Sequence, residues 1–245
     1  MASFGSTTTV DAPGISSGHG GILPPRTYGD NGRPNSGAPD YATRLRRARL
    51  GLLVALTPIF MLFISFTSAY LVRQGLPTLD PATNKLVSDW IPVRLPVLLF
   101  FNTSILLLSS IFMEFARRRA KSEIVVNPPA ATSAARITAG DFPWLPITLI
   151  LGLGFLYGQW LAWRQLAASG FYVTTAPSSS FVYLLTGAHA VHLFGGILVL
   201  FVACLASFLR FSAIRRSIVV DITAWYWHFM TVLWVYILCL LEFAR

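Results

Sequence analysis

Five long apolar stretches, separated by shorter polar segments, dominate the pattern of the chain. They cover residues 50–72, 95–116, 144–166, 181–209 and 222–243. At a rise of about 1.5 Å per residue, each is long enough to cross the roughly 30 Å hydrocarbon core of a bilayer as a helix. A spanning segment must satisfy its own backbone hydrogen bonds, which a single strand cannot do. The pattern therefore predicts an all-α membrane protein with a bundle of five transmembrane helices.

The segment before the first apolar stretch has a different composition. Residues 1–42 are rich in Gly, Ser, Thr and Pro and contain few large apolar side chains. Such a segment buries too little surface to offset the entropy of ordering, so we expect a disordered N-terminal tail. The predicted organisation is a tail over residues 1–42 and a transmembrane domain over residues 43–245.

The formal net charge of +9 comes from basic residues in the connections between apolar stretches. The six arginines up to Arg49 and the eight basic residues of the second and fourth connections make 14 of the 19 Lys and Arg residues, and the other side of the predicted bundle has 5. The positive-inside rule then predicts a cytoplasmic N-terminus and a C-terminus on the outer side. Topology and anionic head groups account for the charge, so we expect no nucleic-acid partner.

Polar side chains inside apolar stretches are costly and form the short list of candidate functional residues. They are Asn102, Thr103, Ser109, Ser110, Glu114, Gln159, His189, His192, His228 and Glu242. Both carboxylates lie near predicted helix ends, and Glu114 lies beside the basic cluster that starts at Arg117. A proton pump or ion-coupled carrier usually places ionisable groups near the midplane, so the chain is a poor candidate for a proton path of its own.

His189 and His192 are three residues apart, which places both imidazoles on one face of the fourth helix, followed by Gly195 and Gly196. Small residues with a few polar ones are typical of helix interfaces in membranes, so contacts with helices or lipid are the favoured interpretation. A haem held by His189 and His228, as in a small b-type cytochrome, is the alternative, and a small transporter is another. The pair has no third metal ligand near it in sequence.

Other clusters indicate packing. The aromatic run from Trp225 to His228 is typical of an interfacial belt, and Gln159 follows several glycines, as a polar contact on a closely packed face does. Cys204 and Cys239 are interpreted as packing residues. We predict no catalytic residue, no bound cofactor and no metal site on the chain. The candidates for lipid or helix-interface contacts are Asn102, Gln159, His189, His192, Gly196, Trp227 and His228.

Two segments resemble the cytochrome c oxidase subunit III family and its relatives in quinol oxidases. Thr186, Gly187, His189, His192 and Gly196 are similar to the family's T-G-x-H-x-x-H-x-x-x-G segment. The fifth stretch resembles Y-W-H-F-x-D-x-x-W through its run from Tyr226 to Trp234, with Phe181, Asn102, Thr103, Phe155 and Gln159 adding further similarity. The resemblance extends over roughly residues 50–234, and five helices match the short bacterial form of the family.

The resemblance implies a non-catalytic subunit of a proton-translocating terminal oxidase, most similar to cytochrome c oxidase. Such subunits pack against subunit I beside subunit II, bind phospholipid and sustain turnover, with haem and copper in the partner subunits. The implied location is the bacterial plasma (inner) membrane, with the C-terminus periplasmic. A quinol oxidase subunit or a nitric-oxide-reductase accessory protein remains an alternative. Three acidic positions of the family are replaced here, by Ile59, Ala162 and Thr231.

Overall fold

The computed structural model describes residues 41–79, 86–87, 90, 95–126, 143–209 and 213–243. Five helices account for nearly all of these residues: α1 (Tyr41–Gly75), α2 (Leu98–Val126), α3 (Trp144–Ala168), α4 (Pro177–Phe208) and α5 (Ala213–Phe243). All five are long and apolar enough to cross a membrane, which confirms the predicted fold class. The predicted tail over residues 1–42 lies outside the described residues except for its last two positions, which belong to α1.

The predicted helix bounds were too short at one end of the bundle. The structure starts α1 at Tyr41, continues α2 to Val126 and starts α5 at Ala213, about nine residues beyond the predicted limits in each case. Hydropathy marks where lipid ends, whereas a helix continues wherever its polar residues find water or ion-pair partners. Between α1 and α2, two short strands, β1 (Thr78–Leu79) and β2 (Leu86–Val87), pair antiparallel, with Thr78 opposite Val87. The apolar pattern did not predict this hairpin.

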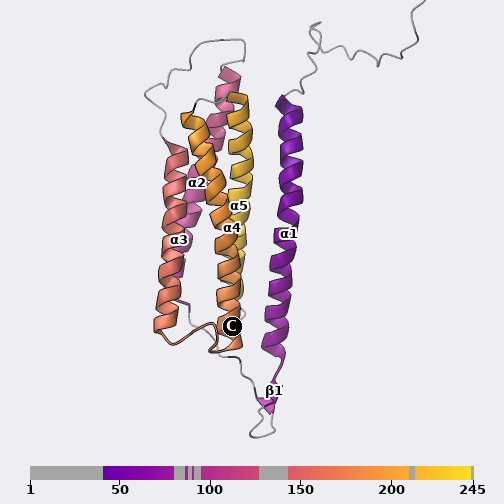
Figure 1. Cartoon of the computed structure of the whole chain (residues 1–245), viewed down its shortest axis with the longest axis vertical. Coiled ribbons are helices and arrows are strands. Elements are labelled where there is room, and N and C mark those ends of the chain that lie inside the picture. Colours follow the sequence, from indigo (N-terminus) through magenta and orange to yellow (C-terminus); the bar gives the residue numbers. More distant parts are fainter. Residues whose placement is uncertain are drawn as a thin grey trace, which may run out of the picture. The chain divides into compact units, whose positions relative to one another are not determined.

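Helix α5 is the central element of the bundle. It contacts α1, α2 and α4, while α3 packs between α2 and α4 (Figure 1). Along α5, buried residues recur every three or four positions, including Trp227, Met230, Trp234, Ile237 and Leu241. This spacing is typical of helices that pack at a small crossing angle, and it gives α5 an apolar stripe facing its neighbours.

Helix α1 is attached along a single line of side chains. Its buried residues are Leu56, Phe63 and Tyr70, spaced seven apart, and among the described elements it contacts only α4 and α5. Pro58 lies within α1, which continues through it. Most other apolar side chains of α1, such as Val54 and Phe60, are exposed. In a membrane protein such a surface faces lipid or another subunit.

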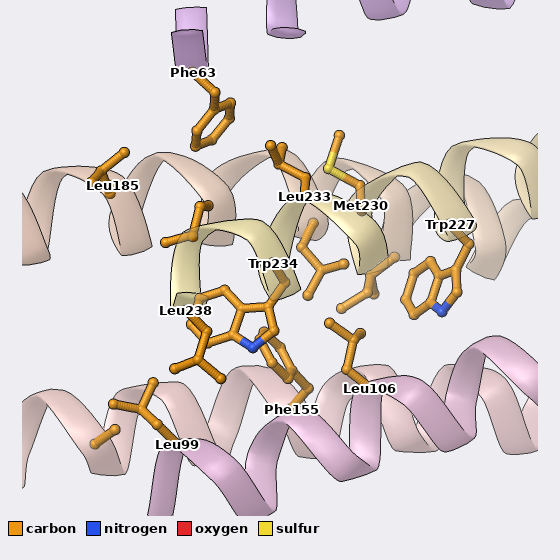
Figure 2. Close-up of a cluster of buried hydrophobic side chains, with 14 of the residues drawn as sticks. Phe63, Leu99, Leu106, Phe155, Leu185, Trp227, Met230, Leu233, Trp234 and Leu238 are labelled. Atoms are coloured by element: carbon orange, nitrogen blue, oxygen red, sulfur yellow. The ribbon is translucent and has the colours of Figure 1, made fainter. Parts of the chain in front are cut away.

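The core contains large aromatic side chains (Figure 2). Two of them, Trp227 and Trp234, also donate hydrogen bonds. Trp234 on α5 packs edge-on against Phe155 on α3 with ring centroids 5.0 Å apart, and its indole N–H donates to Thr103 Oγ1 at 2.9 Å. Trp227 Nε1 donates to Ser109 Oγ at 3.2 Å, and Ser109 Oγ donates to the Thr148 carbonyl at 3.3 Å. These bonds join α2, α3 and α5 inside the bundle.

Candidate functional site

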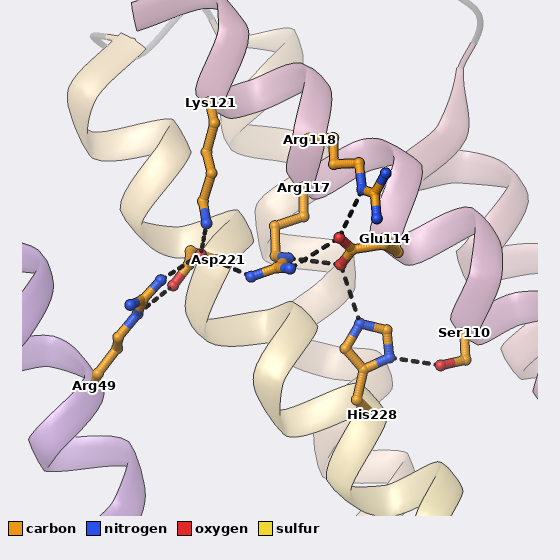
Figure 3. Close-up of polar contacts among 8 residues, drawn as sticks. All are labelled: Arg49, Ser110, Glu114, Arg117, Arg118, Lys121, Asp221 and His228. Atoms are coloured by element: carbon orange, nitrogen blue, oxygen red, sulfur yellow. Dashed lines mark hydrogen bonds and ion pairs between the residues drawn. The ribbon is translucent and has the colours of Figure 1, made fainter.

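A cluster of charged side chains joins α1, α2 and α5 at the end of the bundle where α1 begins (Figure 3). At its centre is Asp221 of α5, whose side chain is fully buried. Arg49 of α1 donates to both carboxylate oxygens, at 2.8 Å from Nε and 3.0 Å from Nη2. Lys121 Nζ lies 2.9 Å from Oδ1, and Arg117 Nη1 lies 3.5 Å from the same oxygen. A buried carboxylate needs such partners, and three cations supply them here.

Glu114 forms the second half of this cluster. Arg117 donates to its two oxygens from Nε and Nη2, at 2.6 and 2.8 Å, and Arg118 Nε donates at 2.9 Å. The predicted proximity of Glu114 to the basic cluster is therefore confirmed. Because Arg117 contacts both Glu114 and Asp221, the two carboxylates belong to one network.

His228 connects this network to the apolar part of the bundle. Its Nδ1 lies 2.5 Å from Ser110 Oγ and its Nε2 lies 3.5 Å from Glu114 Oε2. Both ring nitrogens thus have partners on α2 (Figure 3). The arrangement links α1 and α2 to α5 through Asp221. It contains four cations and two carboxylates, and Arg118 is the most exposed of the cations. Its chemistry is that of charge-assisted structural contacts with a local excess of positive charge.

His189 and His192, predicted to share one face of α4, point to different neighbours. His189 is fully buried among the four helices α2 to α5, with its ring 5.0 Å from that of Trp234 and 6.1 Å from that of Phe155. His192 is half-buried on the side of α1, 5.9 Å from the Phe63 ring, and its Nδ1 donates to the Ala188 carbonyl at 2.7 Å. Three residues rotate a helix by about 300°, so the 60° difference is enough to separate the two environments.

The structure does not bring His189 and His228 together. His228 contacts Ser110 and Glu114 in the charged cluster, whereas His189 packs against the rings of Phe155 and Trp234. Trp234 lies six residues after His228 on α5. Within the described residues, no group of three or more His, Cys, Asp or Glu side chains has a geometry that could hold a metal ion. Cys204 is buried and Cys239 is exposed, and both are free thiols.

Asn102 and Gln159 lie inside the core, at 1% and 2% exposure. Asn102 Nδ2 donates to the Phe155 carbonyl at 3.0 Å and so joins α2 to α3. Neither amide oxygen has a hydrogen-bond partner among the described residues.

Trp227 and Gly196 form a close contact between α4 and α5. A Cβ added at Gly196 would lie 2.7 Å from Tyr226 Cε1, and one added at Gly152 on α3 would lie 2.7 Å from Trp227 Cη2. The prediction that the aromatic run is an interfacial belt is wrong for Trp227, which is fully buried, while Trp225 is 49% exposed. Glycines on two helices leave the space that the Trp227 indole fills.

The family resemblance implies acidic residues at three positions of this chain. Two of them carry apolar side chains, and the third carries a hydroxyl that bonds within its own helix. Ile59 packs against the core, and Ala162 is buried beside a small cavity. Thr231 is buried, and its hydroxyl donates to the Trp227 carbonyl at 2.9 Å. None of these side chains leaves a polar group that requires a charged partner.

Asp221 and Arg49 are the residues of the site that sequence reasoning missed. In the sequence, Arg49 contributes only to the count of basic residues, and Asp221 lies one residue before the fifth apolar stretch, residues 222–243. The available signal was an acidic residue just before an apolar stretch, at the same end of the bundle as most of the arginines.

Comparison with known proteins gives a consistent result. A sequence model of the family described as cytochrome c oxidase subunit III matches residues 40–243. The probable cytochrome c oxidase subunit 3 of Mycobacterium leprae (strain TN) is 31% identical over 106 residues, which is 42% of this chain and 50% of that protein. The chain thus spans about half the length of the mycobacterial relatives it matches. Cytochrome c oxidase subunit 3 of Thermostichus vulcanus is 28% identical over 194 residues, or 78% of this chain and 85% of that protein. The corresponding protein of Bacillus subtilis (strain 168) is 25% identical over 190 residues, covering 77% and 82%.

Proposed function

The chain belongs to the cytochrome c oxidase subunit III family, and from this we propose that it is a non-catalytic subunit of a respiratory haem-copper oxidase that packs against subunit I, beside subunit II. The observation that carries the proposal is the family match over residues 40–243, which covers all five helices. In this proposal haem and copper belong to the partner subunits, and the chain supports aerobic electron transport through assembly and sustained turnover.

The chemistry of the chain supports a structural role. Its buried carboxylate, Asp221, and the partly exposed Glu114 are paired with arginine and lysine, and both nitrogens of His228 have partners. Groups that are paired in this way stabilise helix contacts and are not free to exchange ligands. The b-type cytochrome alternative needs His189 and His228 on opposite sides of one haem, and their separate surroundings do not favour it.

A cytochrome c oxidase is favoured over a quinol oxidase or a nitric-oxide-reductase accessory role. The relatives from Mycobacterium leprae, Thermostichus vulcanus and Bacillus subtilis are all named as subunits of a cytochrome c oxidase. The electron donor is a property of other subunits, so this assignment rests on the similarity of the relatives alone.

We further propose that the chain is a multi-pass protein of the bacterial plasma membrane with its charged cluster on the cytoplasmic side. The described cations at this end include Arg49, Arg117, Arg118 and Lys121, and they exceed the carboxylates beside them. By the positive-inside rule, this distribution supports a cytoplasmic charged cluster and a periplasmic C-terminus. Bound phospholipid belongs to the same proposal, because the excess charge suits anionic head groups and α1 exposes apolar side chains beside it.

Affinity purification tests this role. The full chain with a C-terminal tag is isolated from membranes in mild detergent, and the co-purifying polypeptides are identified by mass spectrometry. We expect a subunit I and a copper-bearing subunit II in equal amounts with the tagged chain. Recovery of the chain without any haem-copper partner, from membranes that retain oxidase activity, would contradict the proposal.

A further inference from the structure

Three helices each place a buried polar side chain in the core formed by α2 to α5. These are Asn102, Gln159 and His189, exposed by 1%, 2% and 0%. Four of their atoms have no hydrogen-bond partner among the described residues: Asn102 Oδ1, Gln159 Oε1 and both ring nitrogens of His189. Buried polar atoms without partners are rare, and a group of four in one region needs a physical explanation.

The three side chains lie at the same level of the bundle. Trp163 Nε1 donates to Thr186 Oγ1 at 3.1 Å and so fixes the register of α3 against α4. These helices run antiparallel, so Gln159, one turn before Trp163, faces the region of His189, about one turn after Thr186. Asn102 donates to the Phe155 carbonyl, and a Cβ added at Gly158 would overlap Asn102 Oδ1. This amide oxygen therefore lies against α3 immediately beside Gln159.

Donors are available to these atoms, yet the three side chains do not bond to one another. A neutral imidazole has one N–H donor and one acceptor nitrogen, Gln159 Nε2 carries two N–H donors, and Asn102 Nδ2 uses one of its two for the Phe155 carbonyl. Even so, both amide oxygens and both ring nitrogens are without a partner among the described residues. A water molecule, with two donors and two acceptors, can bridge polar groups that are too far apart to bond directly.

We propose that Asn102, Gln159 and His189 form a binding site for at least one ordered water molecule inside the helix bundle. The water donates to acceptors of this group and bridges α4 to α2 or α3. A small cavity of about 10 Å³, enough for about one water, is lined by Gln159, Thr186 and Trp234 but not by Asn102 or His189, so it adjoins this group on the Gln159 side. The proposal rests on these contacts and is independent of the oxidase role.

An imidazolium is an alternative that would satisfy both amide oxygens without water, because it has two N–H donors. No carboxylate contacts His189 among the described residues, and its ring packs against the aromatic rings of Phe155 and Trp234. A charge without a counter-ion in such surroundings is strongly disfavoured, so a neutral imidazole with water is the better account.

A cryo-EM map of the purified complex at about 2 Å resolution is the direct test. We expect water density within roughly 2.6–3.2 Å of a His189 ring nitrogen and of at least one of the two amide oxygens. An empty layer, with no water density within hydrogen-bond distance of His189, Asn102 or Gln159, would overturn the proposal.

The Gln159→Leu variant gives a second test, in which the thermal midpoint of the complex changes differently if the site holds water and if it is dry. If Gln159 binds a bridging water, the substitution removes an acceptor from a satisfied group and lowers the thermal midpoint of the complex. If the layer is dry and Gln159 Oε1 is unpaired, the substitution leaves the midpoint unchanged or raises it, which would overturn the proposal. Gln165→Leu, at an exposed position of the same helix, is the matched control and should leave the midpoint unchanged.

Discussion

Arg49 on α1 and Asp221 on α5 form a two-point ion pair between residues that are 172 positions apart in the sequence. Two single hydroxyl bonds, Tyr41 to Ser217 and Tyr236 to Thr67, each 3.1 Å long, also join α1 to α5. Since α1 otherwise packs along one line of three side chains, the ion pair is the main polar attachment of this helix.

Removing the Asp221 carboxylate should loosen this attachment. Asp221→Asn leaves Arg49, Lys121 and Arg117 without the carboxylate that they share. We expect the free energy of unfolding to fall by about 3 kcal/mol. This is the low end of the range for buried pairs, because Arg49 and Lys121 are partly exposed. Thermal unfolding of the purified complex measures the effect. Arg118→Gln breaks an exposed pair with Glu114 and should cost at most about 1 kcal/mol. Equal losses in both variants would contradict a central role for Asp221.

The close contact of α4 with α5 predicts different outcomes for two neighbouring glycines. Gly196→Ala places a Cβ 2.7 Å from Tyr226 Cε1, so the helices must shift, and we expect a destabilisation of about 1–3 kcal/mol. Gly195→Ala meets no atom within 4 Å and should be tolerated. The measurement is the thermal midpoint of the complex and the amount of subunit retained in it. Equal tolerance of both substitutions would show that the two helices are further apart than described.

The proposed topology predicts which end of the bundle is accessible from outside the cell. In a variant lacking Cys204 and Cys239, Ser122→Cys places an exposed thiol at the charged end, and Thr174→Cys places one at the opposite end. We expect an impermeant maleimide to label Thr174→Cys in intact cells and Ser122→Cys only after the membrane is opened. The reverse labelling pattern would invert the topology.

The number and nature of the helices were predictable because apolar length alone determines whether a segment spans a membrane. The positions of the helix ends at the charged side were not predictable. Arg49 on α1 and Lys121 on α2 each pair with Asp221 on α5, so these polar segments remain helical. Hydropathy treats each of these residues as a reason to stop a span. Their pairing depends on tertiary positions that no local pattern contains.

The environment of individual side chains was only partly predictable. The close packing at Gly196 follows from a small residue on an apolar helix, as expected. The burial of Trp227 was missed because its position in a run of aromatic residues is typical of an interface, and only the space left by Gly152 and Gly196 shows otherwise. The separation of His189 from His192 depends on where α1 lies, which the sequence pattern does not give.

In our proposal, this chain supports an oxidase without carrying a redox centre. His189 and His228 are the residues that would bind a haem if the chain carried one. The absorption spectrum of the chain, released from the purified complex by detergent and normalised to its concentration, tests the claim most directly. We predict no stoichiometric Soret band, and haem content of the parent complex that is unchanged by His189→Gln or His189→Leu. A Soret band at one haem per chain, lost in both variants, would contradict the account and identify the chain as a membrane cytochrome.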